Sequence, residues 1–338
     1  MCGIVGFIKL NTRQKKTISF ENMDFAFSET MSRGKEATGF FTPTTGVVKD
    51  GIDASDFVKK FDKEIRAGLN SPVFIGHCRI ATSGFKDGLS SASNNDNNHP
   101  HEGKRFILVH NGHFSGLFPI RNYPYNGNCD SELALAYIET FGVERGIALM
   151  PKTDNFSLVI YDKVEHKTYF YRESNPLIMG YDFNTGNLLF GSTSHIVLAM
   201  VDNVKIFGLT FGDKLSPLYS TDEGLLYTIE SGKDVVSTKI GLPASRYDAE
   251  KNVMTEGERK QLDIPEPTTT SYAVHRGSGS YPYEPAYARM ERIAGTGSEH
   301  SIKQKITSSR RLEVFTTLLN GEVMFASTIT TNMKAIVH

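Results

Sequence analysis

The sequence predicts an α+β fold followed by a C-terminal extension, on three observations. Short apolar runs rich in β-branched residues, typical of buried strands, recur before about residue 240. Between them lie segments with apolar residues at four-residue spacing, typical of helices. Beyond about residue 240 the chain becomes rich in Pro, Gly, Ser and Tyr, as extended or linker segments are. We therefore expect one domain over 2–240 and an extension over 241–338.

The expected elements follow from local pattern. In the first helix Met23, Phe27 and Met31 share one face, and in the second Gly142 lies just past the C-terminal end. We expect Asp130 or Ser131 near the N-cap of the second helix. The elements expected in chain order are a strand over 1–10, a helix over 19–33, strands over 73–82 and 105–112, a helix over 130–142, a hairpin over 155–174, a strand running into a helix over 187–200, and a hairpin over 310–331.

Composition narrows the class of protein. With 39% hydrophobic and 22% charged residues, the chain can bury an ordinary core. Its net charge of −1 gives no sign of a nucleic-acid or membrane partner. The odd number of cysteines, 3, and a start without a basic leader fit a reducing cytoplasm better than a disulfide framework. The apolar run near the start is too short to span a bilayer. We expect a cytoplasmic protein.

Cys2 stands at the head of the first predicted strand. If Met1 is removed, one residue holds both a thiol and a free α-amine, which titrates near ~7.7–8.0 and can act as a base. A nucleophile with its own base is the N-terminal-nucleophile arrangement. The alternative is that Cys2 is a small buried hydrophobic residue.

Three further positions have a chemical and a structural interpretation. Asn111 and Gly112 end an apolar strand, where they form either an oxyanion hole or a hairpin turn. Arg79 suits a carboxylate but also a surface ion pair. Asp130 suits an ammonium group but also a helix cap. Taken together, a thiol, an oxyanion hole, an arginine and an aspartate describe a site for glutamine.

The motifs that contain these residues resemble those of one family. MCGIVGFI, RGKEATGF, GHCRIATSG, NNHPHEGKRFILVHNG and NCDSE occur in the order and rough spacing of class II glutamine amidotransferases. The chain most resembles the glutaminase domain of glucosamine-6-phosphate synthase, over roughly 2–210. The resemblance implies a four-layer αββα sandwich of two mainly antiparallel sheets, the N-terminal-nucleophile (Ntn) hydrolase fold.

The resemblance also implies the catalytic and supporting residues. Cys2 corresponds to the nucleophile, with its own amine as the base. Asn111 and Gly112 correspond to the oxyanion hole. Arg33 matches an arginine that supports the loop of the nucleophile, and His99 matches the first histidine of a supporting HPH element.

The residues that bind substrate follow from the same resemblance. Arg79 corresponds to the group that holds the glutamine carboxylate, Asp130 to the group that holds its ammonium, and Thr82 to a further contact. The sequence departs from the family at Ile80, where an aromatic residue is frequent, and at Ser83, where histidine is frequent. The polar loop over 83–98 is longer than in the synthase, where the corresponding loop closes over glutamine.

A metal site is the competing interpretation of the histidines. Five histidines with Cys78 nearby include ligand types of zinc, but their spacing matches no standard zinc motif. The HPH element is already explained by the resemblance. The glycines form no phosphate-binding motif, so we expect neither a metal nor another cofactor. The five histidines are His77, His99, His101, His110 and His113.

The expected activity is hydrolysis of L-glutamine to glutamate and ammonia. About 100 residues after the domain are too few for an ordinary acceptor domain, so the ammonia is expected to pass to a separate synthase subunit. The sequence leaves a homo-oligomer open. One alternative is a stand-alone amidohydrolase that acts on another γ-glutamyl amide. Another is a non-catalytic assembly protein that retains the fold. The extension is expected to serve assembly or partner docking.

Overall fold

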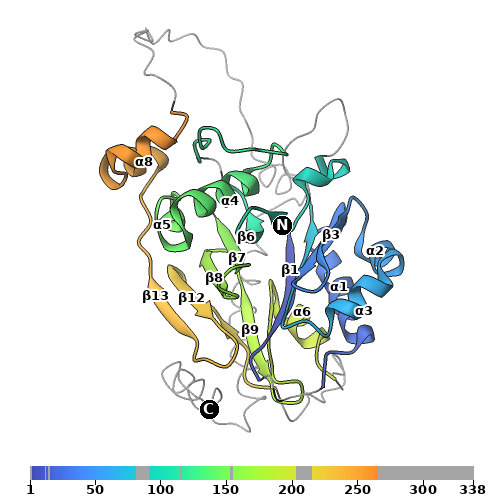
Figure 1. Cartoon of the computed structure of the whole chain (residues 1–338). Helices are drawn as coiled ribbons and strands as arrows, with labels where there is room; N and C mark the ends of the chain where they lie inside the picture. The colour runs from blue at the N-terminus through green and yellow to red at the C-terminus, as the bar shows by residue number, and fades with distance from the viewer. Residues whose placement is uncertain are drawn as a thin grey trace, which may run out of the picture. The chain divides into compact units, whose positions relative to one another are not determined.

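Figure 1 shows the computed structural model of the chain. It describes residues 2–11, 13, 16–80, 91–114, 116–152, 155–202 and 215–264. The described residues lie in one compact unit that continues to Ile264. The expected hairpin over 310–331 and most of the expected extension lie outside the described residues.

Two sheets, in which every described strand pairing is antiparallel, form the centre of this unit. The seven-stranded sheet has, in spatial order, β11 (Tyr219–Ser220), β9 (Ile178–Asp182), β10 (Asn187–Gly191), β1 (Gly3–Lys9), β4 (Val73–Arg79), β2 (Ala37–Thr42) and β3 (Gly46–Asp50). The six-stranded sheet has β13 (Val236–Lys239), β12 (Leu225–Ile229), β8 (Thr168–Glu173), β7 (Phe156–Asp162), β6 (Phe106–Gly112) and β5 (His101–Glu102).

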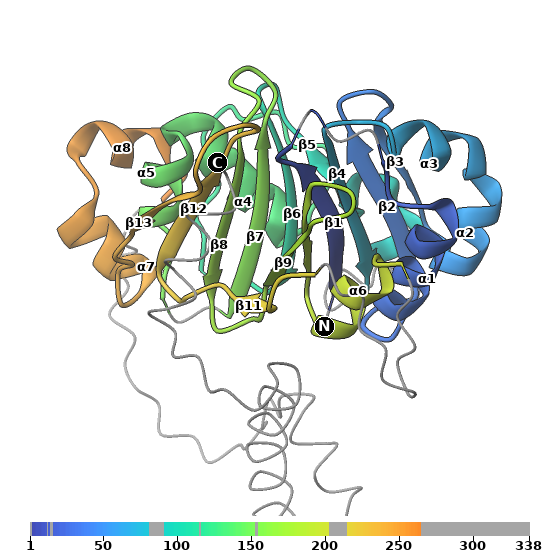
Figure 2. The same cartoon turned by 90° about the horizontal axis from the view of Figure 1, so that it is seen from below.

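Helices cover the outer face of each sheet, and Figure 2 shows the resulting layers. The helices packed against the seven-stranded sheet are α1 (Phe20–Met31), α2 (Ala54–Lys60), α3 (Asp62–Gly68) and α6 (Ser194–Ala199). Those against the six-stranded sheet are α4 (Asp130–Phe141) and α5 (Val143–Ala148). Three short helical segments follow: α7 (Arg246–Asp248), a π-helical turn at Ala249–Val253 and α8 (Glu256–Gln261). Two 3₁₀ turns, Ser91–Ser93 and Asn95–Asn97, precede β5. The predicted α+β fold with two stacked antiparallel sheets is confirmed.

The side-chain alternation of the strands defines an outer and an inner face for each sheet. Phe156 and Leu158 of β7 pack with helix α4, so they lie on the outer face. Tyr161 of β7 instead contacts Phe41 of β2, with ring centroids 5.3 Å apart. Odd-numbered residues of β7 therefore lie on the inner face, by which one sheet packs on the other.

The start of α4 differs in part from the expectation. The N-cap residue is Cys129, and its side chain makes no capping hydrogen bond. Asp130 is the first helical residue, and its carboxylate accepts a hydrogen bond from the backbone N–H of Phe114 instead. Asp130 and Ser131 thus lie next to the N-cap, as predicted. The interpretation of Asp130 as a helix cap is wrong, because its carboxylate bonds the backbone of Phe114 rather than that of its own helix.

Residues 241–264, placed in the expected extension, pack on the domain. Met254 and Leu262 are buried in the hydrophobic cluster beneath α4. The guanidinium of Arg145 on α5 forms an ion pair with Glu258 on α8, with 2.6 Å between Nε and Oε1. These contacts tie the α8 segment to the helical layer, so the compact unit extends beyond residue 240.

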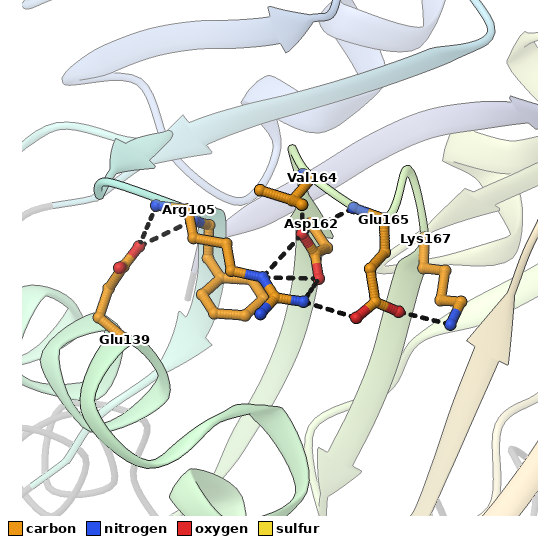
Figure 3. Close-up of polar contacts among 7 residues, drawn as sticks. Arg105, Glu139, Asp162, Val164, Glu165 and Lys167 are labelled. Carbon is orange, nitrogen blue, oxygen red and sulfur yellow. Dashed lines mark hydrogen bonds and ion pairs between the residues drawn. The ribbon is translucent and has the colours of Figure 1, made fainter.

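A polar cluster fixes the end of the six-stranded sheet where β6 begins and β7 ends (Figure 3). Arg105 donates from Nε to both carboxylate oxygens of Asp162 at 3.0 Å, and its Nη2 lies 2.6 Å from Oδ2. The same guanidinium bonds Glu165, which also pairs with Lys167. On the other side, Glu139 of α4 accepts from the backbone N–H of Arg105 at 2.8 Å. One arginine thus joins a strand, a hairpin turn and a helix.

We expect Asp162→Asn to destabilise the domain. Asp162 is fully buried, and its carboxylate also accepts the backbone N–H groups of Val164 and Glu165. Loss of a buried charged acceptor lowers the free energy of unfolding by about 1–3 kcal/mol. We expect the lower end of this range, because the partner Arg105 is 41% exposed. Thermal unfolding at pH 7 measures the effect. Lys167→Gln, which removes an exposed pair, is the control and should leave the melting temperature almost unchanged.

This destabilisation should depend on pH. Burial alone would raise the pKa of Asp162, but the hydrogen bond from Arg105 and two backbone N–H groups bring it below its usual value. A carboxyl group whose pKa is lower in the folded than in the unfolded state stabilises the fold at pH values above its unfolded-state pKa of ~3.9. This stabilisation is lost as the pH falls below that value. The difference between wild type and Asp162→Asn should therefore shrink below pH ~4. A difference that stays constant down to pH ~2.5 would contradict this assignment.

Candidate active site

Cys2 lies at the head of β1, which is a central strand between β10 and β4. The next residue, Gly3, faces the outer side, because a Cβ there would meet the Thr30 side chain of α1 at 2.4 Å. Since side chains alternate, Cys2 and Ile4 lie on the inner face. Cys2 is 9% exposed. The fold therefore holds this thiol at one end of the interface between the sheets.

The surroundings of Cys2 keep its thiol neutral. Burial raises its pKa, an effect that the charge of Arg79 opposes and the charge of Asp130 reinforces. The thiol donates to the backbone oxygen of Ile80 over 3.8 Å, and Arg33 Nε donates to the Cys2 carbonyl at 2.8 Å. The backbone of Cys2 is thus held in place, while its thiol needs a base before it can act as a nucleophile.

Asn111 and Gly112 end β6, on the other sheet. Leu108 of β6 packs on the outer face, so alternation places Asn111 on the inner face. The Asn111 side chain is fully buried, and among the described residues neither its Oδ1 nor its Nδ2 has a hydrogen-bond partner. Its backbone oxygen accepts from Asn175 Nδ2 at 2.8 Å. Gly112 has φ +146°, and a Cβ there would lie 2.1 Å from the Asn155 oxygen, so this position requires glycine.

Arg79 ends β4 on the inner face of the seven-stranded sheet. It is 5% exposed, and its Nη1 donates to Asn98 Oδ1 at 3.2 Å. Asn98 is itself held by donating from Nδ2 to the Ala92 oxygen at 2.7 Å. Gly34 allows close approach of the neighbouring loop, because a Cβ there would meet the Arg79 carbonyl carbon at 2.4 Å. The guanidinium is therefore fixed before any substrate arrives.

Asp130 lies at the start of α4. Its Oδ2 accepts from the Phe114 N–H at 2.7 Å and lies 3.2 Å from His113 Nδ1. Burial alone would raise the pKa of Asp130, but the hydrogen bond with His113 and the charge of His110 bring it to about 2. Asp130 is therefore a carboxylate at neutral pH, as a group that binds an ammonium must be.

Two histidines connect the elements that carry these residues. His77 on β4 bonds through Nε2 to the His110 oxygen on β6 at 3.0 Å. His110 bonds through Nδ1 to Ser131 Oγ on α4 at 2.9 Å. Burial lowers the pKa of His77 to about 3 and that of His110 to about 4, so both rings stay neutral. These bonds brace the strand ends and the helix start against one another.

His99 lies within the same histidine group. Its ring packs on His77, with centroids 4.1 Å apart, and on the edge of His101 at 4.5 Å. Burial lowers the pKa of both His99 and His101 well below the usual value. His101 Nε2 lies 3.3 Å from Cys129 Sγ. Over the described ranges, no group of three or more His, Cys, Asp or Glu side chains is arranged to hold a metal ion.

Five of the predicted site residues lie at strand ends or at the start of α4: Cys2, Arg79, Asn111, Gly112 and Asp130. Arg33 follows α1 and His99 precedes β5, whereas Thr82 lies outside the described residues. Sequence reasoning missed two residues that hold predicted site residues in place. Asn98 follows a run of asparagines, which indicated only a loop. Asn175 follows a strand end and gave no signal at all.

The fold and the sequence relatives together support a class II glutamine amidotransferase fold. Two relatives are a probable glutamine–fructose-6-phosphate aminotransferase of Acanthamoeba polyphaga mimivirus, 27% identical over 195 residues, and the glutamine–fructose-6-phosphate aminotransferase of Streptococcus pneumoniae serotype 4, 27% identical over 202 residues. The matches cover 54% and 53% of this chain. The chain spans only 31% and 30% of those two proteins. No family model matches the chain.

Two solved structures resemble the chain at a coarse level. One is the glutamine phosphoribosylpyrophosphate amidotransferase of B. subtilis complexed with ADP and GMP, with a TM-score of 0.49 and 14% identity, covering 71% of this chain and 49% of that one. The other is a "predicted glutamine amidotransferase" from Pseudomonas aeruginosa, with a TM-score of 0.38 and 16% identity, covering 70% and 95%.

Among the helices that the structure describes, none is both long enough and apolar enough to cross a bilayer.

Proposed function

We propose that this chain is the glutaminase component of an amidotransferase and hydrolyses L-glutamine to glutamate and ammonia. The observation that carries the proposal is the buried, unpartnered amide of Asn111 on the inner face opposite the sheet that carries Cys2. A purely structural Asn at this burial would be expected to have hydrogen-bond partners. An amide that can donate to a developing oxyanion is what a thiol nucleophile requires.

The reaction follows from the residues in place. Removal of Met1 leaves Cys2 with a free amine, which takes the thiol proton while sulfur bonds to the γ-carbon of glutamine. The oxygen becomes an oxyanion, to which Asn111 Nδ2 and the Gly112 N–H donate. The proton passes to the leaving nitrogen, the C–N bond breaks and ammonia departs. Water then cleaves the γ-glutamyl thioester, which gives glutamate and restores the thiol.

The charged residues select the substrate. Arg79 offers two parallel donors for the α-carboxylate, and Asp130 offers a carboxylate for the α-ammonium. Arg33, which donates to the Cys2 backbone, and His99, within the buried histidine group, support the site. Thr82 is a further substrate contact in this proposal. No metal or other cofactor takes part.

The ammonia is passed to a separate synthase. The described residues that carry the proposed site belong to the compact unit that continues to Ile264. The remaining residues, 265–338, serve assembly or partner docking in this proposal. We place the protein in the cytoplasm, where glutamine is abundant and a free thiol stays reduced.

Ammonia release from L-glutamine by the purified full chain tests the proposal. Enzyme-coupled detection of ammonia and of glutamate should show equal amounts of both products. The chain should be assayed in parallel with γ-glutamyl amides that carry larger leaving amines. Faster hydrolysis of such an amide, with little ammonia from glutamine, would show a stand-alone amidohydrolase and contradict the proposed function.

A further inference from the structure

Ser157 on β7 is a buried polar residue that the proposed reaction does not use. It is fully buried, and its Oγ has no hydrogen-bond partner among the described residues. Ser157 is the direct cross-strand partner of Asn111 in the β6–β7 pairing. Opposite residues in an antiparallel pair have Cβ atoms about 4.5–5.5 Å apart on the same face. The hydroxyl of Ser157 therefore lies beside the unpartnered amide of Asn111.

Two other neighbours of Ser157 offer its hydroxyl no acceptor side chain. One is Val159, two residues further along β7 on the same face, which is apolar. The partner on the far side is Arg172, which is a donor only and is bonded to the backbone oxygens of Thr221 and Ser174. Asn111 remains the cross-strand neighbour with a free acceptor.

We propose that Ser157 is a positioning residue that orients the amide of Asn111 during the reaction. Its O–H donates to Asn111 Oδ1 once substrate occupies the site, which leaves Nδ2 directed at the oxyanion. An asparagine amide has an acceptor and a donor end of nearly equal shape. Without a donor on Oδ1, the amide can turn and present oxygen to the oxyanion, which is repulsive. This inference rests on the proposed glutaminase function.

The pairing also accounts for the unpartnered side-chain atoms of Asn111 and Ser157. Asn111 Oδ1 gains a donor, the Ser157 hydroxyl gains an acceptor, and Nδ2 is left for the reacting oxygen. Buried polar groups without partners are rare in folded proteins, and their explanation is commonly functional. Two of them on adjacent strands, on the face that carries the site, therefore support a shared role.

Ser157→Ala tests the inference in the full chain. We expect kcat for glutamine to fall on the order of 10-fold, less than the ~10²–10³-fold expected for loss of the oxyanion donor itself, with KM almost unchanged. The melting temperature should not fall, because the variant removes a buried hydroxyl that has no partner. A purely structural role would move stability rather than kcat.

The control variant is Thr168→Val. Thr168 on β8 also has a buried, unpartnered hydroxyl, but it pairs with Tyr161 at the opposite end of β7. It lies four residues along β8 from the partner of Ser157, about 13 Å away. Removal of this hydroxyl should leave kcat unchanged.

A double-mutant cycle separates action through Asn111 from direct action. Ser157→Ala should cause no further loss of kcat in the Asn111→Ala background, because there is no amide left to orient. An equal fall in both backgrounds would overturn the positioning role, as would full activity of Ser157→Ala in the wild-type background. A wild-type chain that releases no ammonia from glutamine would overturn the proposed function, and the role of Ser157 with it.

Discussion

Replacement of Cys2 by alanine is expected to abolish glutamine hydrolysis. The covalent path requires sulfur at this position, so kcat should fall by roughly 10⁴–10⁶-fold, as in other enzymes that lose their nucleophile. The fold should survive, because the change removes one sulfur atom from the head of a strand. Ammonia release and the melting temperature, measured on the same preparation, test both parts.

Two controls accompany Cys2→Ala. Cys78→Ala changes a buried thiol in the hydrophobic cluster under α1, so it should lower the melting temperature and retain activity. The glutamine analogue 6-diazo-5-oxo-L-norleucine should label Cys2 and spare Cys78 and Cys129. The intact mass of the active protein should lack Met1. Activity that persists without Cys2 would show that another nucleophile carries the reaction.

Replacement of Asn111 by alanine should produce the second largest effect. Loss of one oxyanion donor typically lowers kcat by ~10²–10³-fold, and KM should hardly change because the contact strengthens only as charge develops. The fold should not suffer, since the amide has no partner among the described residues. Steady-state kinetics on glutamine give the two parameters separately.

Arg79→Lys is the matched comparison for Asn111→Ala. A lysine ammonium is a point charge and cannot replace the two parallel donors of a guanidinium, so this variant should mainly raise KM. The opposite profiles assign binding to one strand end and charge stabilisation to the other. If both variants lowered kcat alike, the two roles would not be separate.

The sequence predicted the hairpin over 155–174 well, because its alternation is local. The start of α1 is also set locally, since the Ser19 hydroxyl accepts from the N–H of Asn22 three residues on. Asp130 is the contrasting case. Its partner is the backbone of Phe114, 16 residues away, which no local pattern indicates. A contact between two elements, rather than the capping propensity of aspartate, determines where the Asp130 carboxylate bonds.

The environment of the site was less predictable than its residues. The five histidines read from the sequence included plausible metal ligands, yet His77 and His110 are neutral braces once burial has lowered their pKa values. The segment after residue 240 has the composition of a linker, yet Met254 and Leu262 are buried against α4. Burial depends on the whole fold, so composition alone could not separate these cases.

The division of the site between two sheets has a consequence for how the protein is made. Cys2 is synthesised well before residue 187, but β1 becomes a central strand only when β10, at Asn187–Gly191, has been synthesised and paired beside it. Asn111 is aligned only when β7 has formed. Under the proposed function, the site around the Cys2 thiol is therefore incomplete until most of the domain has left the ribosome. An unfinished chain is then expected not to hydrolyse glutamine.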